Sequence, residues 1–298
     1  MPVVKVNAQH DAPRRLWQTA ETLQEGAPIV VMVHGYRYSP SSPAHDPHRH
    51  ILSLDPDHSC RRAHSWPRAL GFGTGAREEG LALAFGWEAR GSLGGAYRRA
   101  GEAGASLARI VSQLAERAGR PVAVIGHSLG ARVALQSLQH ADPGSIGRVI
   151  LLTGAEFRCA AADALDSRAG QDAEIINVTS RENDIFDFAL EQWLSRGRRQ
   201  ALGFGLDTPS RNWIDVQIDH GETLAALESL GFPTERRPLR LSHWTPYLRR
   251  GLFDFYRTAL CRPWALPIGM LHARLPGRIE PRWSRLLAGP AQFGLARG

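Results

Sequence analysis

A serine between two glycines is the feature of this sequence best suited to covalent chemistry. Gly126-His127-Ser128-Leu129-Gly130 follows the apolar run 122–125 and precedes the helix-forming run 131–135. A G-x-S-x-G pattern between a strand and a helix is typical of a nucleophile elbow. Gly126 and Gly130 leave room for the strand and the helix to approach each other, and the turn presents the hydroxyl of Ser128 at the edge of the sheet. We therefore predict that Ser128 is a nucleophile.

A serine nucleophile needs two N–H groups that stabilise the oxyanion formed during attack on a carbonyl. The backbone N–H of Leu129, directly after the serine and at the start of a helix, is the first candidate. The second is expected in a loop after an earlier strand, where His34-Gly35-Tyr36 follows the apolar run of residues 29–33. Gly35 permits the backbone geometry of such a loop. The N–H of Tyr36 is therefore the second predicted donor.

The acid of a Ser–acid–His triad is expected after a strand that follows the nucleophile. The run Ile175–Val178 is followed by Thr-Ser-Arg-Glu-Asn-Asp, which ends at Asp184. We predict that Asp184 orients the histidine and stabilises its protonated form. Asp187 and Glu182 are local alternatives, and Asp184 alternatively serves only as the cap of the following helix.

Two histidines compete for the role of general base. His243 lies ahead of the last clear helix, after a short apolar stretch at residues 239–241. His220 directly follows the sixth predicted strand, and a further long helix comes after it. The base of such triads usually lies between the final strand and the final helix, so the pattern favours His243 and keeps His220 as the alternative.

The elements that must position these residues alternate between strand and helix. Buried strands are predicted at residues 29–34, 81–85, 121–125, 148–152, 174–178 and 213–218. Helices are predicted at residues 95–119, 129–139, 184–195, 221–230 and 247–260. This alternation predicts an α/β protein with a doubly wound, mostly parallel sheet. Residues 1–261 are assigned to one domain, and residues 262–298 to a C-terminal extension.

A polar, histidine-rich insert is predicted at residues 36–66, directly after the first strand. It is expected to be a long loop that acts as a lid over the site, because loops in this place often shape pockets. Histidines and carboxylates are also metal ligands, but their spacing matches no standard motif, so no metal site is predicted. The histidines that keep a metal site open are His45, His48, His50, His58 and His64.

The charge of the chain is concentrated at its C-terminal end. The formal net charge of the 298 residues is +7, and residues 262–298 contribute six arginines and a single acidic residue, Glu280. Lys5 is the only lysine, so the basic composition alone does not predict nucleic-acid binding. The extension is expected either to pack on the domain or to bind an anionic membrane surface. The absence of a signal-like or long apolar segment predicts a cytoplasmic protein.

The sequence resembles the α/β-hydrolase superfamily, and within it a bacterial group of uncharacterised serine-hydrolase-like proteins. The resembling segments are VVMVHGY, LAFGWEARGSLGGAY, VAVIGHSLGARVALQSL, INVTSREND and LSHWTPYLRRGLFDFY. The resemblance implies a hydrolase of an ester or similar acyl bond with the triad Ser128, Asp184 and His243, and it does not identify the substrate. We expect a small-molecule or lipid-like acyl substrate and no cofactor. An acyltransferase, a non-catalytic binding protein and a peripheral membrane protein on the same scaffold remain alternatives.

Overall fold

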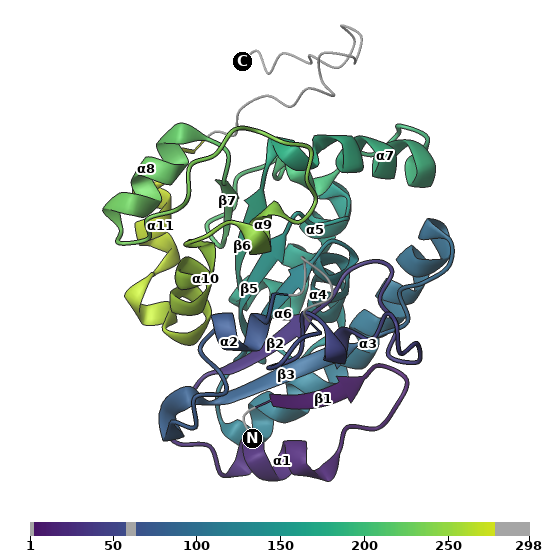
Figure 1. The fold of residues 1–298 in the computed structure, drawn as a ribbon, viewed down its shortest axis with the longest axis vertical. Coiled ribbons are helices and arrows are strands. Elements are labelled where there is room, and N and C mark those ends of the chain that lie inside the picture. Colours follow the sequence, from purple (N-terminus) through teal and green to yellow (C-terminus); the bar gives the residue numbers. More distant parts are fainter. Residues whose placement is uncertain (1–2, 58–63, 278–298) are drawn as a thin grey trace, which may run out of the picture.

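The computed structural model describes residues 3–57 and 64–277. Seven parallel strands form one sheet in the order β1-β3-β2-β4-β5-β6-β7. Helices lie on both of its faces (Figure 1), which confirms the predicted doubly wound α/β architecture. The strands are β1 (Val3–Asn7), β2 (Ile29–Val33), β3 (Leu81–Gly86), β4 (Val122–His127), β5 (Ile146–Leu152), β6 (Glu174–Thr179) and β7 (Trp213–Gln217).

Helices occupy the predicted runs at residues 95–119, 129–139, 184–195 and 221–230, whereas the run predicted at 247–260 is divided into two helices. Short helices lie between them. The helices are α1 (Arg14–Glu21), α2 (Trp66–Ala69), α3 (Leu93–Ala118), α4 (Leu129–His140), α5 (Arg158–Asp166), α6 (Arg168–Asp172), α7 (Asp184–Ser195), α8 (Gly221–Ser229), α9 (Thr245–Leu248), α10 (Leu252–Cys261) and α11 (Ile268–Arg274). The described part of the C-terminal extension is therefore partly helical, and Leu271 of α11 is buried against one face of the sheet.

Strand β1 is the one strand that was not predicted from the sequence; helices α1 and α5 were not predicted either. The side chains of β1 alternate between buried and more exposed positions, and Lys5 at its centre is exposed. The strand pairs only with β3, so it lies at the edge of the sheet. An edge strand with a charged centre lacks the continuous apolar run that identified the buried strands.

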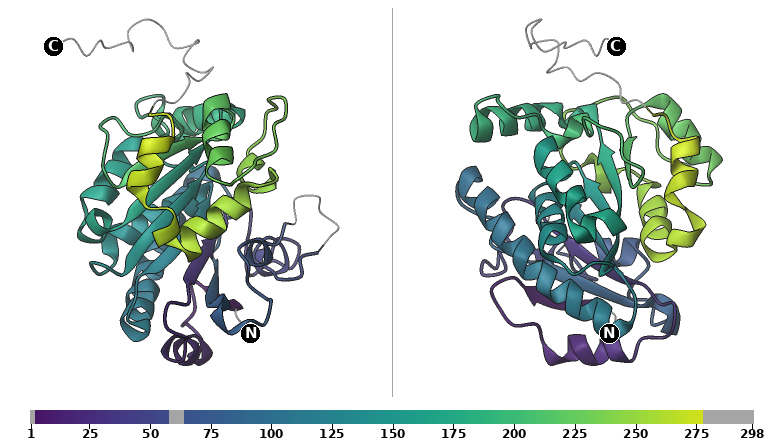
Figure 2. Two further views of the ribbon diagram at one scale, coloured as in Figure 1. Left: turned by 90° about the vertical axis from the view of Figure 1, so that its left-hand side faces the viewer. Right: turned by 180° about the vertical axis from the view of Figure 1, so that it is seen from behind.

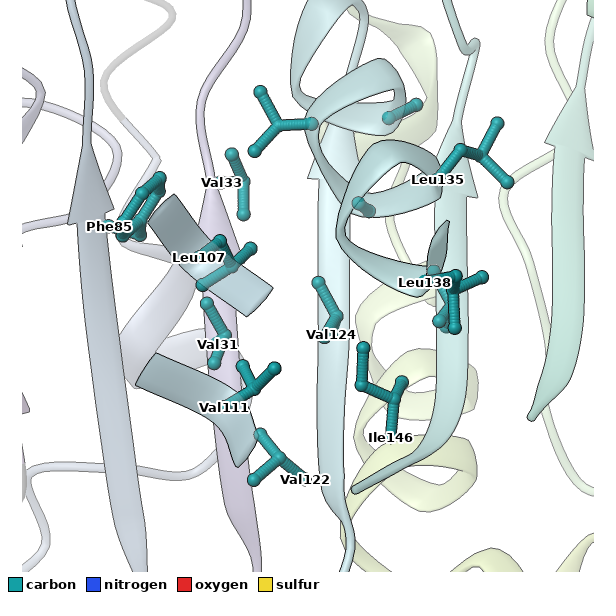
Figure 3. Packing of buried hydrophobic residues seen from close by; sticks show 14 of the residues in the cluster. Val31, Val33, Phe85, Leu107, Val111, Val122, Val124, Leu135, Leu138 and Ile146 are labelled. Atoms are coloured by element: carbon teal, nitrogen blue, oxygen red, sulfur yellow. The ribbon is translucent and has the colours of Figure 1, made fainter. Parts of the chain in front are cut away.

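The core consists of two layers because successive strand residues point to opposite faces. In β2, Val31 and Val33 pack with α1, α3, α4, α5 and α6, whereas Val30 and Met32 pack with α2 and α8–α11. Figure 3 shows the first layer, in which Leu107 and Val111 of α3 lie over the strands. The two faces are also visible from the side and from behind in Figure 2.

The histidine-rich insert covers the sheet more than it covers the predicted site. Ile51 and Leu52 are fully buried against the face that also contains Val30 and Met32. Helix α7, by contrast, follows the end of β6 and projects from the body of the fold (Figure 1). Helix α7 therefore lies at the ends of the strands, where it can line a cavity. The middle of the insert does not lie there.

Candidate active site

Ser128 sits on a strained turn between β4 and α4. Its backbone angles are φ 56° and ψ −123°, a region that non-glycine residues rarely adopt. The flanking glycines are required by close backbone contacts, since a Cβ on Gly126 would lie 2.4 Å from the carbonyl oxygen of Gly130. A Cβ on Gly130 would in turn lie 2.4 Å from the carbonyl oxygen of Val33 in β2. Strain of this kind costs on the order of 1–3 kcal/mol and is concentrated at functional sites.

The predicted oxyanion donors lie beside this turn. A Cβ on Gly35 would lie 2.8 Å from Cβ of Ser128, so the loop after β2 touches the serine. Neither the N–H of Tyr36 nor that of Leu129 has a hydrogen-bond acceptor within the described residues. Two unbonded amides next to a serine hydroxyl are what an oxyanion hole requires.

His34 holds the loop after β2 in place. Its Nε2 accepts a hydrogen bond from the N–H of Trp87 at 3.0 Å, and its ring stacks on the Trp87 indole with an interplanar angle of 6°. Its Nδ1 is 2.9 Å from the carbonyl oxygen of Gly35. Because Nε2 accepts, Nδ1 carries the proton and donates it to that carbonyl. Burial lowers the pKa of His34 to about 3, so it stays neutral and holds the loop.

His243 lies in the cavity that contains Ser128, and its ring is held by an amide. Nδ1 of His243 is 2.6 Å from Oδ1 of Asn183, and Nδ2 of Asn183 donates to Oδ1 of Asp187 at 2.9 Å. A carboxylate only accepts hydrogen bonds, so Asp187 fixes the Asn183 amide with its oxygen toward the histidine. The proton of neutral His243 is therefore on Nδ1, and Nε2 is the free base. The structure shows no hydrogen bond between Nε2 and the Ser128 hydroxyl, although it describes both residues.

The structure places Asn183, the neighbour of the predicted Asp184, against Nδ1 of His243. Asp184 was predicted, but the hydrogen bond to His243 is made by Asn183, one residue earlier. A turn of 3-10 helix at Arg181–Asn183 precedes α7, and it brings residue 183 to the histidine. Asp184 is buried at the first position of α7 and does not line the cavity.

Neighbouring residues hold the backbone of His243. Nε2 of His127 lies 2.8 Å from the carbonyl oxygen of His243, and the hydroxyl of Thr153 donates to the same oxygen at 3.3 Å. The ring centroids of His127 and His243 are 4.6 Å apart. The residue before the nucleophile thus positions the predicted base. Nothing in the sequence pattern pointed to Thr153, whose φ of 39° places it in the strained left-handed region.

The segment that carries His243 is tied down by a buried carboxylate. Oε1 of Glu182 accepts from the N–H of Arg240 at 3.0 Å, and its backbone carbonyl accepts from the N–H of Ser242 at 3.0 Å. The guanidinium of Arg249 lies 3.6 Å from Oε2 of Glu182, and both side chains are 1% exposed. Glu182 was predicted as an alternative acid; the structure makes it an anchor of the histidine loop.

Aromatic surroundings change the acid–base behaviour of the site. Phe186 lies with its ring centroid 4.9 Å from that of His243. Burial, and then the nearby His127, lowers the pKa of His243 well below its usual value of 6.5. Burial also lowers the pKa of His127 to about 4. Both rings are therefore neutral at pH 7, the state in which His243 can accept a proton.

The cavity over the serine has a volume of about 670 Å³ and is mainly apolar. It falls within the range of small-molecule sites. Its lining joins the elbow, the oxyanion loop, α7 and the 241–247 segment: Gly35, Tyr36, Arg37, Tyr38, Leu93, His127, Ser128, Leu129, Thr153, Ala155, Asn183, Ile185, Phe186, Asp187, Ala189, Leu190, Trp193, Leu241, His243, Trp244 and Tyr247. Tyr36, Arg37 and Tyr38 are the described residues of the predicted lid that take part.

The alternative histidines lie outside the cavity. His220 caps α8, where its Nδ1 is 3.2 Å from the hydroxyl of Thr223, and it does not line the cavity. In the histidine-rich insert, Nε2 of His48 contacts Oδ1 of Asn7 at 2.7 Å, and His64 packs on Phe253. His58 lies outside the described residues. No group of three His, Cys, Asp or Glu side chains arranged to hold a metal ion occurs in residues 3–57 and 64–277.

Comparison with known proteins gives a partial family match. The model of a family described as "Protein of unknown function (DUF726)" matches residues 92–191, which include α3, the elbow and α4. No curated protein matches the sequence. In the described part of the chain, none of the helices has both the length and the apolar character needed to span a bilayer.

Solved structures match this chain at low sequence identity. The mature form of the Bacillus licheniformis lipase BlEst2 matches with a TM-score of 0.41 and 12% identity, over 82% of this chain and 94% of the lipase chain. Its propeptide form matches with a TM-score of 0.38 and 12% identity, over 88% and 53% of the two chains. MenH from S. aureus matches with a TM-score of 0.33 and 10% identity, over 66% and 86%.

Proposed function

We propose that this protein is a serine hydrolase that cleaves carboxylic esters with an apolar acyl group. The observation that carries the proposal is the strained Ser128 turn, which shares one cavity with His243 and with two unbonded amides. A structural serine gains nothing from such a turn. A nucleophilic role for Ser128 explains why the fold retains a strained turn at this position.

The proposed reaction proceeds through an acyl-enzyme. Nε2 of His243 takes the proton of the Ser128 hydroxyl while Oγ attacks the carbonyl carbon. The N–H groups of Tyr36 and Leu129 stabilise the oxyanion, and collapse of the intermediate expels the alcohol with the proton from His243. Water then attacks the acyl-enzyme with His243 as base, and the carboxylic acid leaves.

The charge that forms on His243 needs a partner, and the Asn183–Asp187 pair supplies it. The imidazolium donates from Nδ1 to the amide oxygen of Asn183, whose own amide donates to the Asp187 carboxylate. The negative charge of Asp187 therefore acts on His243 indirectly, through the amide of Asn183. Such an arrangement, with Asn as the orienting group, is known from cysteine proteases with a Cys–His–Asn site.

The apolar lining defines the acyl part of the substrate. Leu93, Ile185 and Leu190 contribute aliphatic surface, whereas the charged side chains of the lining are those of Arg37 and Asp187. Asp187 is engaged by Asn183. The cavity therefore suits a hydrocarbon chain better than a sugar or a peptide.

A fluorophosphonate probe tests the proposal directly. We expect the folded protein to form an adduct on Ser128, located by mass spectrometry, and to hydrolyse p-nitrophenyl butyrate. Ser128→Ala removes both signals, whereas Ser229→Ala, on the surface of α8, retains them. Absence of an adduct in folded protein, or full esterase activity in Ser128→Ala, contradicts the proposal.

A further inference from the structure

Large apolar side chains surround the mouth of the cavity and are exposed to solvent. Trp193 is 74% exposed and Leu241 is 61% exposed, although both line the cavity. Ile185 and Phe186 are likewise exposed and line the cavity, and the exposed Phe188 and Leu239 are close to these residues in sequence. We call the following set the cavity rim: Ile185, Phe186, Phe188, Trp193, Leu239 and Leu241. All six are among the exposed large hydrophobic residues of the described chain.

Helix α7 buries two carboxylates and exposes apolar side chains, which is unusual for a helix at the surface. Its carboxylates Asp184 and Asp187 are buried, while Ile185, Phe186 and Phe188 between and beside them are exposed. The burial of Asp187 follows from its bond to Asn183, and that bond turns the apolar residues outward. A surface helix normally shows the opposite pattern. Exposed apolar patches of this kind mark interaction sites.

The charges around the cavity rim have one sign. Along α7, the turn after it and residues 239–241, every exposed charged residue is an arginine: Arg196, Arg198, Arg199 and Arg240. Arg37 is exposed on the cavity lining. The side chains of Arg37 and Arg240 form no ion pair with any described residue. The patch thus combines exposed tryptophan and aliphatic side chains with arginines, of which Arg37 and Arg240 form no ion pair within residues 3–57 and 64–277.

We propose that the cavity rim docks on the surface of an anionic lipid assembly. Trp193 and Leu241 would enter the interface between headgroups and acyl chains, and the arginines would contact the phosphates. The cavity opens through the same patch, so a protein partner seated there would close it, whereas a lipid layer presents acyl chains to it. The idea that the lipid supplies the substrate rests on the proposed function; the docking itself does not.

Vesicle sedimentation of the full chain carrying Ser128→Ala tests docking apart from chemistry. We expect binding to phosphatidylglycerol vesicles, at least tenfold weaker binding to phosphatidylcholine vesicles, and weaker binding as salt is raised. Trp193→Ser combined with Leu241→Ser is expected to reduce binding to phosphatidylglycerol at least tenfold. Arg240→Glu is expected to reduce it without affecting the apolar residues.

Matched variants make the proposal falsifiable. Trp264 is 67% exposed but does not line the cavity, so Trp264→Ser is expected to bind as the parent does. Because the substituted side chains are exposed, their variants should keep the parent's melting temperature. The proposal is wrong if the parent does not bind phosphatidylglycerol vesicles, or if the rim variant binds as tightly as the parent. It is also wrong if binding is lost in Trp283→Ser instead, which would place the surface in the C-terminal segment.

The two proposals fail separately. Vesicle binding without fluorophosphonate labelling of Ser128 would retain the docking surface and exclude the hydrolase. Labelling of Ser128 without vesicle binding would retain the hydrolase and exclude docking.

Discussion

Nδ1 of His243 lies 2.6 Å from the amide oxygen of Asn183, so the predicted base is oriented by an amide and not by a carboxylate. The amide cannot turn around freely, because its nitrogen donates to Asp187. An isolated asparagine would present either its oxygen or its nitrogen to the histidine. The bond to Asp187 selects the oxygen and with it the tautomer of His243 that leaves Nε2 unprotonated.

Removal of the Asn183 amide is therefore expected to impair proton transfer. We expect Asn183→Ala to lower kcat by about 10²-fold or more, a typical contribution of positioned acid–base catalysis. Asp184→Asn is expected to lower it by less than about 10-fold, since Nδ1 of His243 contacts Asn183. Steady-state kinetics with p-nitrophenyl butyrate measure both. A larger loss in Asp184→Asn would restore Asp184 as the orienting acid.

The pH dependence of the reaction is expected to reflect the buried histidine. Because burial lowers the pKa of His243 well below 6.5, the base is neutral and active at pH 6. The acid limb of kcat/KM should therefore lie below pH 6.5. Phe186→Ser removes the ring beside His243 and admits water, so the limb should move upward toward 6.5. A parent enzyme that loses half its kcat/KM at pH 6.5 or above would contradict this assignment.

Much of this arrangement follows from the sequence because it depends on local constraints. The buried strands and the glycines around Ser128 leave signals in residue type and spacing, since the elbow backbone admits no Cβ at Gly126 or Gly130. The orienting residue leaves a weaker signal. In the run Arg-Glu-Asn-Asp, residues 183 and 184 are both polar, and which one faces His243 depends on the 3-10 turn before α7.

The cavity rim was not predicted because the exposure of its residues depends on tertiary contacts. Residues 184–195 identify α7 as a helix, but their pattern does not show which face is exposed. Asp187 lies inward, where its carboxylate accepts a hydrogen bond from the Asn183 amide, which in turn contacts His243. A contact between segments some 60 residues apart thus determines which side of the helix faces solvent.

The buried Glu182–Arg249 pair is expected to stabilise the fold and the histidine loop together. Arg249→Ala leaves the Glu182 carboxylate buried without its cation, which typically costs about 3–5 kcal/mol. The double variant Glu182→Leu with Arg249→Met should recover part of the stability, but not the hydrogen bond from Arg240 to Glu182. Urea unfolding measures the first effect, and kcat of the double variant measures the second. Equal kcat in the double variant and the parent would show that Glu182 does not position the loop.

A glycine variant in the elbow is expected to lose stability as well as activity. Gly130→Ala places a Cβ 2.4 Å from the carbonyl oxygen of Val33, a backbone atom that cannot rotate away. Overpacking of this kind costs about 1–3 kcal/mol. Gly221→Ala at the start of α8 is the matched control, since no atom lies within 4 Å of its Cβ position. Thermal unfolding should show a lower melting temperature for Gly130→Ala than for Gly221→Ala; similar values would contradict the packing argument.

Acid is expected to destabilise the protein through the histidines beneath the oxyanion loop. The pKa of His34 is about 3 in the folded chain, against about 6.5 in the unfolded chain. Between these values the unfolded chain binds more protons, so the free energy of unfolding falls as the pH falls from 6.5 to 3. The slope contributed by one such histidine is about 1.4 kcal/mol per pH unit. His127, with a pKa of about 4, adds a similar slope down to pH 4.

A substitution at His34 distinguishes the contribution of His34 to the pH dependence of the free energy of unfolding from that of the carboxylates. The folded chain resists the proton chiefly because His34 is buried, and a proton on Nε2 would also point at the N–H of Trp87. In His34→Gln the stability at pH 7 falls because the stacking on Trp87 is lost, yet the decline between pH 6.5 and pH 4 becomes shallower by about one histidine's share. Urea unfolding at pH 7, 6, 5 and 4 measures both curves. Parallel curves for the parent and His34→Gln would mean that His34 takes up its proton in the folded chain as readily as in the unfolded one, and that it does not hold the oxyanion loop in its neutral form.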